Sequence, residues 1–505
     1  MHAKWDITSK CNLRCTHCSV ADMYFNSGNV PRQLDRKGRL AVLDSLKDGG
    51  VSGLSLLGGE PLTLRGQLLD ILHHATKIGL KLTIVSNGQL LDERTSRSLI
   101  DGGLDSLVVS IEAPVAEIHD GVRGKGTFRK LIHNLEAFLR IRGSSETPRV
   151  IVNTVLSGAN RSVFADMIPF CIGLGVDEWT ALSLMHVGNT LDNLDKMSIS
   201  SETNTEVAIE IAKAMSKHGL GPENNSPKVN IQIIYPCVWE AITKQYGLWL
   251  PQPEICCPAS SGLAYISPSG DAYVCDRVHS HGYVGAKMIT EQLQPINLLE
   301  TSFAEAWESA QFVEMFEFAK RSETYRDYEP CNRCKYLYSG VCNPCPLVAT
   351  KGKSLRLEEC LRAERILGDI SAEADTPPTE WEEQHAFERL CIPPIEAGEF
   401  DRLRGREFRI TRGTRHARQR DGSVLVMQPR ATTPIKFNPV SWAVLERVDS
   451  GKCPQEVIDD FADAYLEIME FKGIASPELQ RSQLTEGYAA FIAHMIGLGV
   501  ISEAA

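Results

Sequence analysis

Clustered cysteines constrain this chain more than any other feature of its sequence. The chain contains fifteen cysteines, and most of them fall in three short segments. These segments hold Cys11, Cys15 and Cys18; then Cys256, Cys257 and Cys275; then Cys331, Cys334, Cys342, Cys345 and Cys360. An odd total fits a disulfide framework poorly, whereas closely spaced thiols are common ligands of metal ions and clusters. The sequence therefore predicts metal binding at more than one site.

Composition and length indicate a globular protein of two or three domains. Hydrophobic residues make up 43% and charged residues 23% of the 505 residues, which is ordinary for a soluble chain. The formal net charge of −11 argues against a general nucleic-acid binder, because affinity for phosphates requires a basic surface. No apolar run reaches the roughly 18 residues that span a bilayer, and the N-terminus has no signal-peptide core. We therefore expect a cytoplasmic protein without a membrane partner.

Residues 3 to about 185 alternate between strand-like and helix-like stretches. The expected strands cover residues 3–7, 53–57, 81–85, 106–111, 149–155 and 178–182. The expected helices cover residues 34–47, 68–78, 93–101, 128–141 and 163–174. Six successive β–α units predict an α/β fold with a partial, TIM-like (β/α)6 barrel, whose functional residues lie at the C-terminal ends of the strands.

The remaining sequence divides into segments of different character. Beyond a barrel at 1–190 we expect a helical connection at 191–250, a cysteine-rich domain at 251–370, an acidic, proline-containing linker at 371–406 and a small winged-helix-like α+β domain at 407–505.

Cys11, Cys15 and Cys18 form a C-x3-C-x2-C motif directly after the first expected strand. Four thiolates normally close a [4Fe–4S] cluster, so three leave one iron with a free coordination position. That iron can chelate the amino and carboxylate groups of S-adenosylmethionine (SAM), and an electron from the cluster can then cleave the sulfonium to a 5′-deoxyadenosyl radical. The alternative is a zinc site with His17 as the fourth ligand.

Gly58-Gly59-Glu60-Pro61 follows the second expected strand, and with the cysteine motif it makes residues 3–190 resemble the radical SAM superfamily. The resemblance implies that the backbone of this turn and the Glu60 carboxylate contact the SAM amino group. It also implies SAM contacts near the ends of later strands, at Ser86, Asn87, Ser110, Glu112, Arg123 and Asn153. Each of these residues, taken alone, has a turn or capping role as its alternative.

The later cysteines resemble the SPASM extension of radical SAM peptide-modifying enzymes, which holds two auxiliary [4Fe–4S] clusters. The resemblance assigns one cluster to Cys257, Cys275 and Cys345, with Cys256 or Cys237 as the candidate fourth ligand. It assigns the other to Cys331, Cys334, Cys342 and Cys360, for three clusters in all. The spacing C-x2-C-x7-C-x2-C differs from the usual C-x2-C-x5-C-x3-C, so the sharing of thiolates stays open, and paired structural zinc sites are the alternative.

Asp276 directly follows Cys275. In the sulfatase-maturing branch of the superfamily, which this position resembles, an aspartate acts as the base near the substrate radical. A carboxylate that supports a cluster, or a surface carboxylate, is the alternative.

The C-terminal segment combines expected strands near 408–412, 423–428 and 433–437 with three helices, and residues 407–503 resemble a PqqD-like peptide-recognition element (RRE). Such modules bind the leader of a ribosomally made precursor as an added strand at a sheet edge. Eight arginines between Arg402 and Arg420 would favour an acidic leader electrostatically, and a solvated or nucleic-acid-facing stretch is their alternative. A winged-helix DNA binder is the alternative.

The combined resemblance predicts an enzyme that modifies a ribosomally synthesised peptide after hydrogen abstraction by the deoxyadenosyl radical. A cross-link, thioether, epimerisation or related change would complete the reaction, with flavodoxin or ferredoxin as the reductant. The alternatives are a maturase of a sulfatase or of a quinone-type cofactor peptide, such as PQQ or mycofactocin, and an iron–sulfur electron carrier or redox sensor without SAM chemistry.

Overall fold

The computed structural model describes most of the first 253 residues and selected segments beyond them. The described residues are 1–26, 32–253, 263–276, 295–309, 312, 328–338, 342, 344, 357–368, 408–410, 415–418, 424–427, 435–437, 442, 444–447, 456–457, 459, 492, 495 and 501–503. The chain divides into two compact units, Met1–Ala372 and Glu373–Ala505, and each is described by itself.

A mainly parallel sheet forms the centre of the first unit and confirms the predicted α/β class. Its first six strands are β1 (His2–Thr8), β2 (Gly53–Gly58), β3 (Lys81–Ser86), β4 (Ser106–Ser110), β5 (Arg149–Leu156) and β6 (Glu178–Ser183). Each strand pairs in parallel with the next in chain order. Alternate residues, among them Trp5, Ile84 and Val109, are fully buried in one core. This alternation leaves the other side of each strand available for polar residues.

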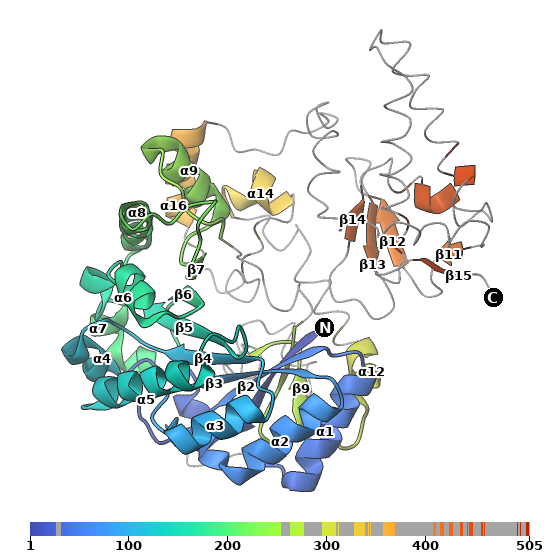
Figure 1. Ribbon diagram of the computed structural model, residues 1–505. Coiled ribbons are helices and arrows are strands. Elements are labelled where there is room, and N and C mark those ends of the chain that lie inside the picture. Colours follow the sequence, from blue (N-terminus) through green and yellow to red (C-terminus); the bar gives the residue numbers. More distant parts are fainter. Residues whose placement is uncertain are drawn as a thin grey trace. The chain divides into compact units, whose positions relative to one another are not determined.

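Helices connect these strands and cover one face of the sheet, as Figure 1 shows for α1, α2, α3 and α5. The helices are α1 (Arg36–Asp48), α2 (Gly66–Lys77), α3 (Glu93–Asp101), α4 (Ala116–Arg123), α5 (Thr127–Arg142) and α6 (Met167–Leu174). Asp35 and Asp92 cap α1 and α3, because their carboxylates accept hydrogen bonds from the amides of Gly38 and Thr95, both at 2.8 Å. Of these helices, α4 is absent from the sequence prediction.

Short helices lie in the connections and in the later part of the first unit. They are the π-helix η1 (Asp22–Asn26), the 3-10 helices η2 (Pro61–Leu64), η3 (Arg161–Val163), η4 (Gly188–Asn193) and η6 (Cys331–Arg333), and the α-helices α7 (Leu194–Met197), α12 (Phe303–Glu308) and α14 (Lys335–Tyr338). Three longer helices are α8 (Ser201–Lys217), α9 (Pro236–Tyr246) and α16 (Leu357–Leu367). Among the described residues, no helix is both long and apolar enough to cross a membrane.

The sheet extends beyond the six predicted strands at both edges. β7 (Lys228–Gln232) pairs in parallel with β6, within the stretch that the sequence predicts to be a helical connection. At the other edge, β8 (Leu263–Ile266) pairs in parallel with β1, and β9 (Asp271–Tyr273) and β10 (Ile296–Asn297) follow as antiparallel strands. Part of the cysteine-rich segment is therefore continuous with the barrel sheet.

The second unit contains two small antiparallel sheets. β11 (Phe408–Ile410) pairs with β15 (Ile501–Glu503), and β12 (Arg415–Arg418), β13 (Val424–Met427) and β14 (Ile435–Phe437) form a three-stranded sheet in that order. β11, β13 and β14 coincide with the three strands expected from the sequence. The described part of this sheet has β12 and β14 at its edges.

A buried carboxylate connects the added strand β8 to β1. Asp6 of β1 accepts hydrogen bonds from Tyr24 of η1 at 2.5 Å and from Tyr265 of β8 at 2.6 Å, and all three side chains are buried. Burial raises the pKa of the Asp6 carboxyl to about 6, although the two phenol hydrogen bonds lower it. This cluster links the segment after the first cysteines to the cysteine-rich region.

The raised pKa of Asp6 predicts a pH-dependent stability. The folded protein binds this proton more tightly than the unfolded chain, so the stabilising effect of the protonated carboxyl is complete at low pH and is lost as the pH rises through about 6. Asp6→Asn retains an oxygen that accepts both phenol hydrogen bonds and does not ionise. Because the unfolded carboxyl titrates near 3.8 and the folded one near 6, we expect the variant to gain about 1–1.5 kcal/mol relative to the parent protein as the pH rises from 5 to 8. Anaerobic thermal melts at both pH values measure this difference.

The control for this prediction is Asp22→Asn, which changes an exposed carboxylate in the same segment as Tyr24. The control variant and the parent protein should keep a constant difference in melting temperature across the pH range. The same constant difference for Asp6→Asn would contradict the prediction.

Candidate functional site

The first cysteine motif lies in the loop between β1 and η1, and distant parts of the chain hold this loop. The Asn189 side chain donates to the carbonyl of Cys15 at 2.9 Å, and the Asn193 side chain donates to the carbonyl of Thr16 at 3.3 Å. The amide of Thr16 donates to the carbonyl of Val122 at 2.9 Å. The loop backbone is thus fixed by η4 and α4, which leaves its cysteine side chains available as ligands.

Two polar side chains approach the sulfurs of this loop. Asn87 Nδ2 lies 4.0 Å from Cys11 Sγ, and Arg123 Nη1 lies 4.0 Å from Cys15 Sγ. Burial raises the pKa of all three thiols, that of Cys18 to about 12. Thiols of this kind usually lose their protons when they bind a metal. The Asn87 amide and the Arg123 guanidinium beside the sulfurs favour the resulting thiolates.

The donor set fits an iron–sulfur cluster with one open iron. Its three thiols come from one loop at the C-terminal end of a barrel strand, and a cube of four irons takes one thiolate at each of three corners. Within the described residues, no three Cys, His, Asp or Glu side chains converge closely enough to hold a single metal ion. His17 Nε2 lies 3.3 Å from Glu112 Oε1, so its nearest ionic partner is a carboxylate. Glu112 therefore engages Nε2 of His17, whereas the buried Nδ1 has no hydrogen-bond partner among the described residues.

The two glycines of the GGEP turn are required by the protein itself. A Cβ on Gly58 would lie 2.3 Å from the carbonyl oxygen of Thr8, and one on Gly59 would lie 2.2 Å from that of Lys10. Gly58 also has a φ of +111°, which side chains with a Cβ rarely adopt. The turn therefore packs directly against the backbone that leads into the cysteine loop.

Glu60 is buried and accepts three hydrogen bonds from the protein. Its donors are the amide of Leu62 at 3.1 Å, the hydroxyl of Ser86 at 2.8 Å and the amide of Asn87 at 2.8 Å. Burial raises the pKa of Glu60, although these hydrogen bonds lower it. In the described structure this carboxylate joins the ends of β2 and β3, and it thereby positions Asn87 beside Cys11.

Glu112 and Arg123 form a buried ion pair next to the same loop. Two guanidinium nitrogens of Arg123 lie 2.8 and 2.5 Å from Glu112 Oε1, and the amide of Val155 donates to Oε2 at 3.1 Å. Burial alone would raise the pKa of Glu112, but the charges of Arg123 and His17 hold it well below its usual range. The carboxylate is therefore ionised and keeps Arg123 against Cys15.

The other expected SAM contacts lie along the same edge of the sheet. Ser110 ends β4, and Asn153 of β5 is opposite it in the strand register. Asn153 does not end its strand as expected, since β5 continues to Leu156. Pro61 begins η2 and is buried. These positions gather the predicted contacts at the C-terminal ends of β2 to β5.

Asp276 lies beside the first half of β1, and not at the C-terminal strand ends that carry the predicted SAM contacts. It follows β9, which runs antiparallel to β8, and its carboxylate lies 3.7 Å from the ammonium of Lys4 on β1. Lys4 is two residues before the buried Asp6, so Asp276 joins a chain of titratable groups along β1. A role as the catalytic base stays a prediction.

The later cysteines are described in part. Cys256, Cys257 and Cys345 lie outside the described residues. Cys275 is buried at the end of β9. Cys331, Cys334, Cys342 and Cys360 lie in the described segments, where burial raises the pKa of Cys331 to about 12.

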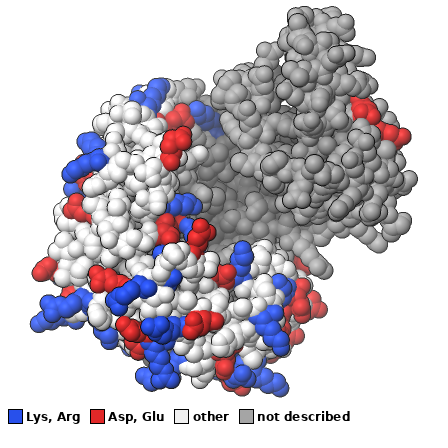
Figure 2. All heavy atoms as spheres, in the orientation of Figure 1, with Lys and Arg blue, Asp and Glu red and all other residues white. Residues whose placement is uncertain are grey.

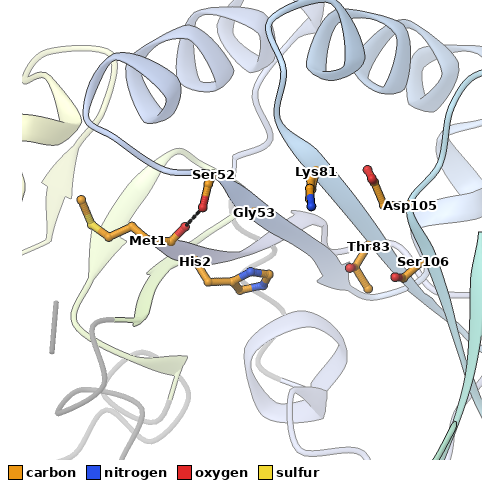
Figure 3. Close-up of a pocket in the computed structure, with 8 residues that line it drawn as sticks. All are labelled: Met1, His2, Ser52, Gly53, Lys81, Thr83, Asp105 and Ser106. Atoms are coloured by element: carbon orange, nitrogen blue, oxygen red, sulfur yellow. Dashed lines mark hydrogen bonds between the residues drawn. The ribbon is translucent and has the colours of Figure 1, made fainter. Parts of the chain in front are cut away.

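A hollow of about 480 Å³ opens at the opposite edge of the sheet from the cysteine loop (Figure 3). Its lining residues belong to the starts of β1 to β4 or precede them, and they are Met1, His2, Ser52, Gly53, Lys81, Thr83, Asp105 and Ser106. Since it lacks cysteines and lies away from the strand ends that carry the motifs, it is separate from the site described above.

Three groups that support this site carry no motif in the sequence. Asn189 and Asn193 lie in a polar stretch that reads as an ordinary loop, and Asp6 reads as one residue of a strand. Each acts through a partner more than a hundred residues away or on another element. A pattern in one sequence carries no signal for such pairs.

The Glu112–Arg123 pair generates a direct prediction. Glu112→Gln leaves the buried guanidinium without its carboxylate partner, so we expect a loss of about 3–5 kcal/mol in stability. Glu93→Gln is the matched control, because Glu93 and Arg140 form an exposed pair at 3.7 Å whose loss costs less than about 1 kcal/mol. Anaerobic thermal melts compare the two variants. Equal melting temperatures for Glu112→Gln and Glu93→Gln would contradict the prediction that the buried pair stabilises the fold more than the exposed pair does.

Family models match the two regions that carry the cysteines. The radical SAM superfamily model matches residues 5–171, and the SPASM model, described as an iron–sulfur cluster-binding domain, matches residues 256–335. The first match contains the cysteine loop and the residues around it. The second match contains Cys275, Cys331 and Cys334.

Curated proteins and solved structures extend these matches. An AdoMet-dependent heme synthase of Oleidesulfovibrio alaskensis is 25% identical, over 68% of this chain and 81% of its own length. A PqqA peptide cyclase of Rhodopseudomonas palustris is 26% identical, over 66% of this chain and 78% of its own. The crystal structure of Streptococcus suis SuiB bound to S-adenosylmethionine is 19% identical with a TM-score of 0.51, over 70% of this chain and 74% of that one, and supports the fold. The chain is therefore an enzyme of α/β fold whose residues 5–171 match the radical SAM superfamily, which implies a [4Fe–4S] cluster and SAM, and whose residues 256–335 match a SPASM iron–sulfur cluster-binding domain.

Proposed function

We propose that this enzyme modifies a ribosomally synthesised precursor peptide. The observation that carries the proposal is the combination of a three-cysteine site in a radical SAM barrel with a separate C-terminal unit that has short antiparallel sheets. The relatives named PqqA peptide cyclase and mycofactocin maturase support a peptide substrate. The bond that is made or broken depends on the precursor.

The protein's own residues prepare the site for this chemistry. SAM and the cluster, when bound, supply a deoxyadenosyl radical that removes a hydrogen atom from the substrate. Cys11, Cys15 and Cys18 would hold the cluster, and Arg123 and Asn87 supply a cation and a donor near these sulfurs. Glu112 keeps Arg123 in place, and Glu60 keeps the β2 and β3 turns together. Asp276 is the proposed base for the proton that the substrate radical would release as its electron passes to an auxiliary cluster.

The second unit is the proposed leader-binding module. β12 is an edge strand of the described sheet and includes Arg415 and Arg418. An acidic leader that added as a strand beside β12 would gain backbone hydrogen bonds and charge complementarity. On the face of the first unit shown in Figure 2, by contrast, acidic and basic side chains are interspersed. Within the second unit, the arginine-rich stretch from Arg402 to Arg420, which contains β12, is the part whose charge favours an acidic segment.

Three [4Fe–4S] clusters, a flavodoxin or ferredoxin reductant and a cytoplasmic location complete the proposal. The two auxiliary clusters would stabilise the cysteine-rich segment and accept or deliver electrons. Low-potential clusters and reduced thiols both suit a reducing compartment.

Action on a porphyrin is the second candidate function. Proteins named AdoMet-dependent heme synthase match over 68–70% of this chain and over 81–93% of their own lengths, which is broader coverage of the relative than the peptide cyclase gives. The two candidates differ in substrate class and not in the SAM site. A substrate assay therefore separates them.

The test uses the full chain, reconstituted and reduced anaerobically, with each short peptide encoded beside the gene and, separately, with iron coproporphyrin III. We expect 5′-deoxyadenosine formation together with a mass change in one peptide. Arg415→Glu combined with Arg418→Glu should weaken leader binding at least about tenfold, because two attractive contacts become repulsive. Fluorescence anisotropy of a labelled leader measures the binding.

The control is Arg94→Glu combined with Arg129→Glu, which makes the same charge change at exposed positions of the barrel helices. This control should leave leader binding unchanged. Conversion of the porphyrin without any peptide modification would overturn the proposal in favour of the second candidate. Equal weakening by both double variants would contradict leader binding at β12.

A further inference from the structure

Five described cysteines gather where two helices of the first unit meet. α9 packs along α16, and the segment around α14 lies beside both. The Tyr336 hydroxyl donates to the Glu240 carboxylate, and Lys335 Nζ lies 3.9 Å from the same group. Lys244 Nζ donates to the carbonyl of Leu367 at 3.3 Å. Glu240 and Lys244 are one turn apart on α9. One face of α9 therefore contacts both α14, which directly follows Cys334, and α16, which contains Cys360.

Cys237 lies on this face of α9, three residues before Glu240. Its side chain is 2% exposed, and its thiol forms a hydrogen bond with that of Cys360 on α16. Cys331 and Cys334 also lie close enough to Cys237 for the charge on one sulfur to affect the others. Cys237 is therefore next to three of the four cysteines that the family pattern assigns to the second auxiliary cluster, and the fourth, Cys342, also lies near Cys360.

We propose that Cys237 is a thiolate ligand of the second auxiliary cluster, together with Cys331, Cys334 and Cys360, in the place that the family pattern assigns to Cys342. A cube of four irons accepts four thiolates, so five neighbouring thiols leave one that is not a ligand. Cys342 follows Cys334 after seven residues instead of the usual five, and it is less buried than Cys237. The longer spacing removes Cys342 from the pattern, and α9 supplies a replacement.

The binding step changes no oxidation state. Each thiol releases its proton to solvent, and its sulfur forms one bond to one iron. A buried thiol on a helix is well suited to this role, because its backbone is fixed before the cluster binds. The inference rests on the SPASM domain and not on the identity of the substrate.

The test is the iron content of the full chain after anaerobic reconstitution. The parent protein should bind about twelve irons, four for each of three clusters. Cys237→Ala should bind about four fewer, while Cys342→Ala should match the parent. Cys171→Ala is the control, since Cys171 is equally buried but lies in the barrel core on α6. Full iron content in Cys237→Ala, or a loss of about four irons in Cys342→Ala, would overturn the proposal.

A second measurement avoids any variant that fails to fold. The native parent holoprotein is treated with iodoacetamide and analysed by mass spectrometry. Cys342 should be alkylated, whereas Cys237, Cys331, Cys334 and Cys360 should be protected until the iron is removed with a chelator. Protection of Cys342 together with alkylation of Cys237 would overturn the assignment. Because both tests count ligands and not product, they stand apart from the test of peptide modification.

Discussion

The buried ion pair between Glu112 and Arg123 is the interaction on which the site depends. It joins the end of β4 to α4 and brings a fixed positive charge to 4.0 Å from the sulfur of Cys15. Burying two charges is costly unless each is paired and hydrogen-bonded, and both conditions are met here by Arg123, His17 and the amide of Val155. The result is an environment in which a thiolate, and a negatively charged cluster, are favourable beside the barrel edge.

A second buried carboxylate has a similar structural role on the other side of the loop. Glu60 joins the turns after β2 and β3, and the glycines before it allow that turn to touch the backbone of Thr8 and Lys10. Carboxylates in the turns after β2 and β4 therefore hold the strand ends around one cysteine loop. Asp6, with Tyr24 and Tyr265, extends this arrangement to the cysteine-rich segment. The first cysteine loop and the start of the cysteine-rich segment are consequently attached to one sheet.

Local sequence patterns were sufficient to predict the barrel and the position of the cysteine loop. The β-branched runs placed the six strands to within one or two residues of β1 to β6, because buried parallel strands have a strong apolar signal. β7 was missed, since five residues with two buried side chains, Val229 and Ile231, carry a weak signal inside a helical region. Motif residues such as Glu60 lie at the strand ends expected from the sequence, and their contacts with SAM stay predictions, whereas their partners in the protein were not predictable.

Contacts between distant segments account for what the sequence did not reveal. Tyr265 is 259 residues from Asp6, and Cys237 meets Cys360 through the packing of two helices that are far apart in the chain. The family spacing rule assigns cysteines by their distance along the sequence. A rule of that kind has no means of including a thiol contributed by another helix, and α9 contributes one.

Electron paramagnetic resonance of the reduced protein tests most directly whether Cys11, Cys15 and Cys18 hold a cluster with one iron open to SAM. The measurement is best made in a Cys331→Ala, Cys334→Ala background, in which the signal of one auxiliary cluster is removed. Addition of SAM should change the spectrum of the remaining signals, and Cys15→Ala should abolish that change. A spectrum that SAM leaves unaltered, or protein that contains zinc in this loop and no iron, would contradict the radical chemistry.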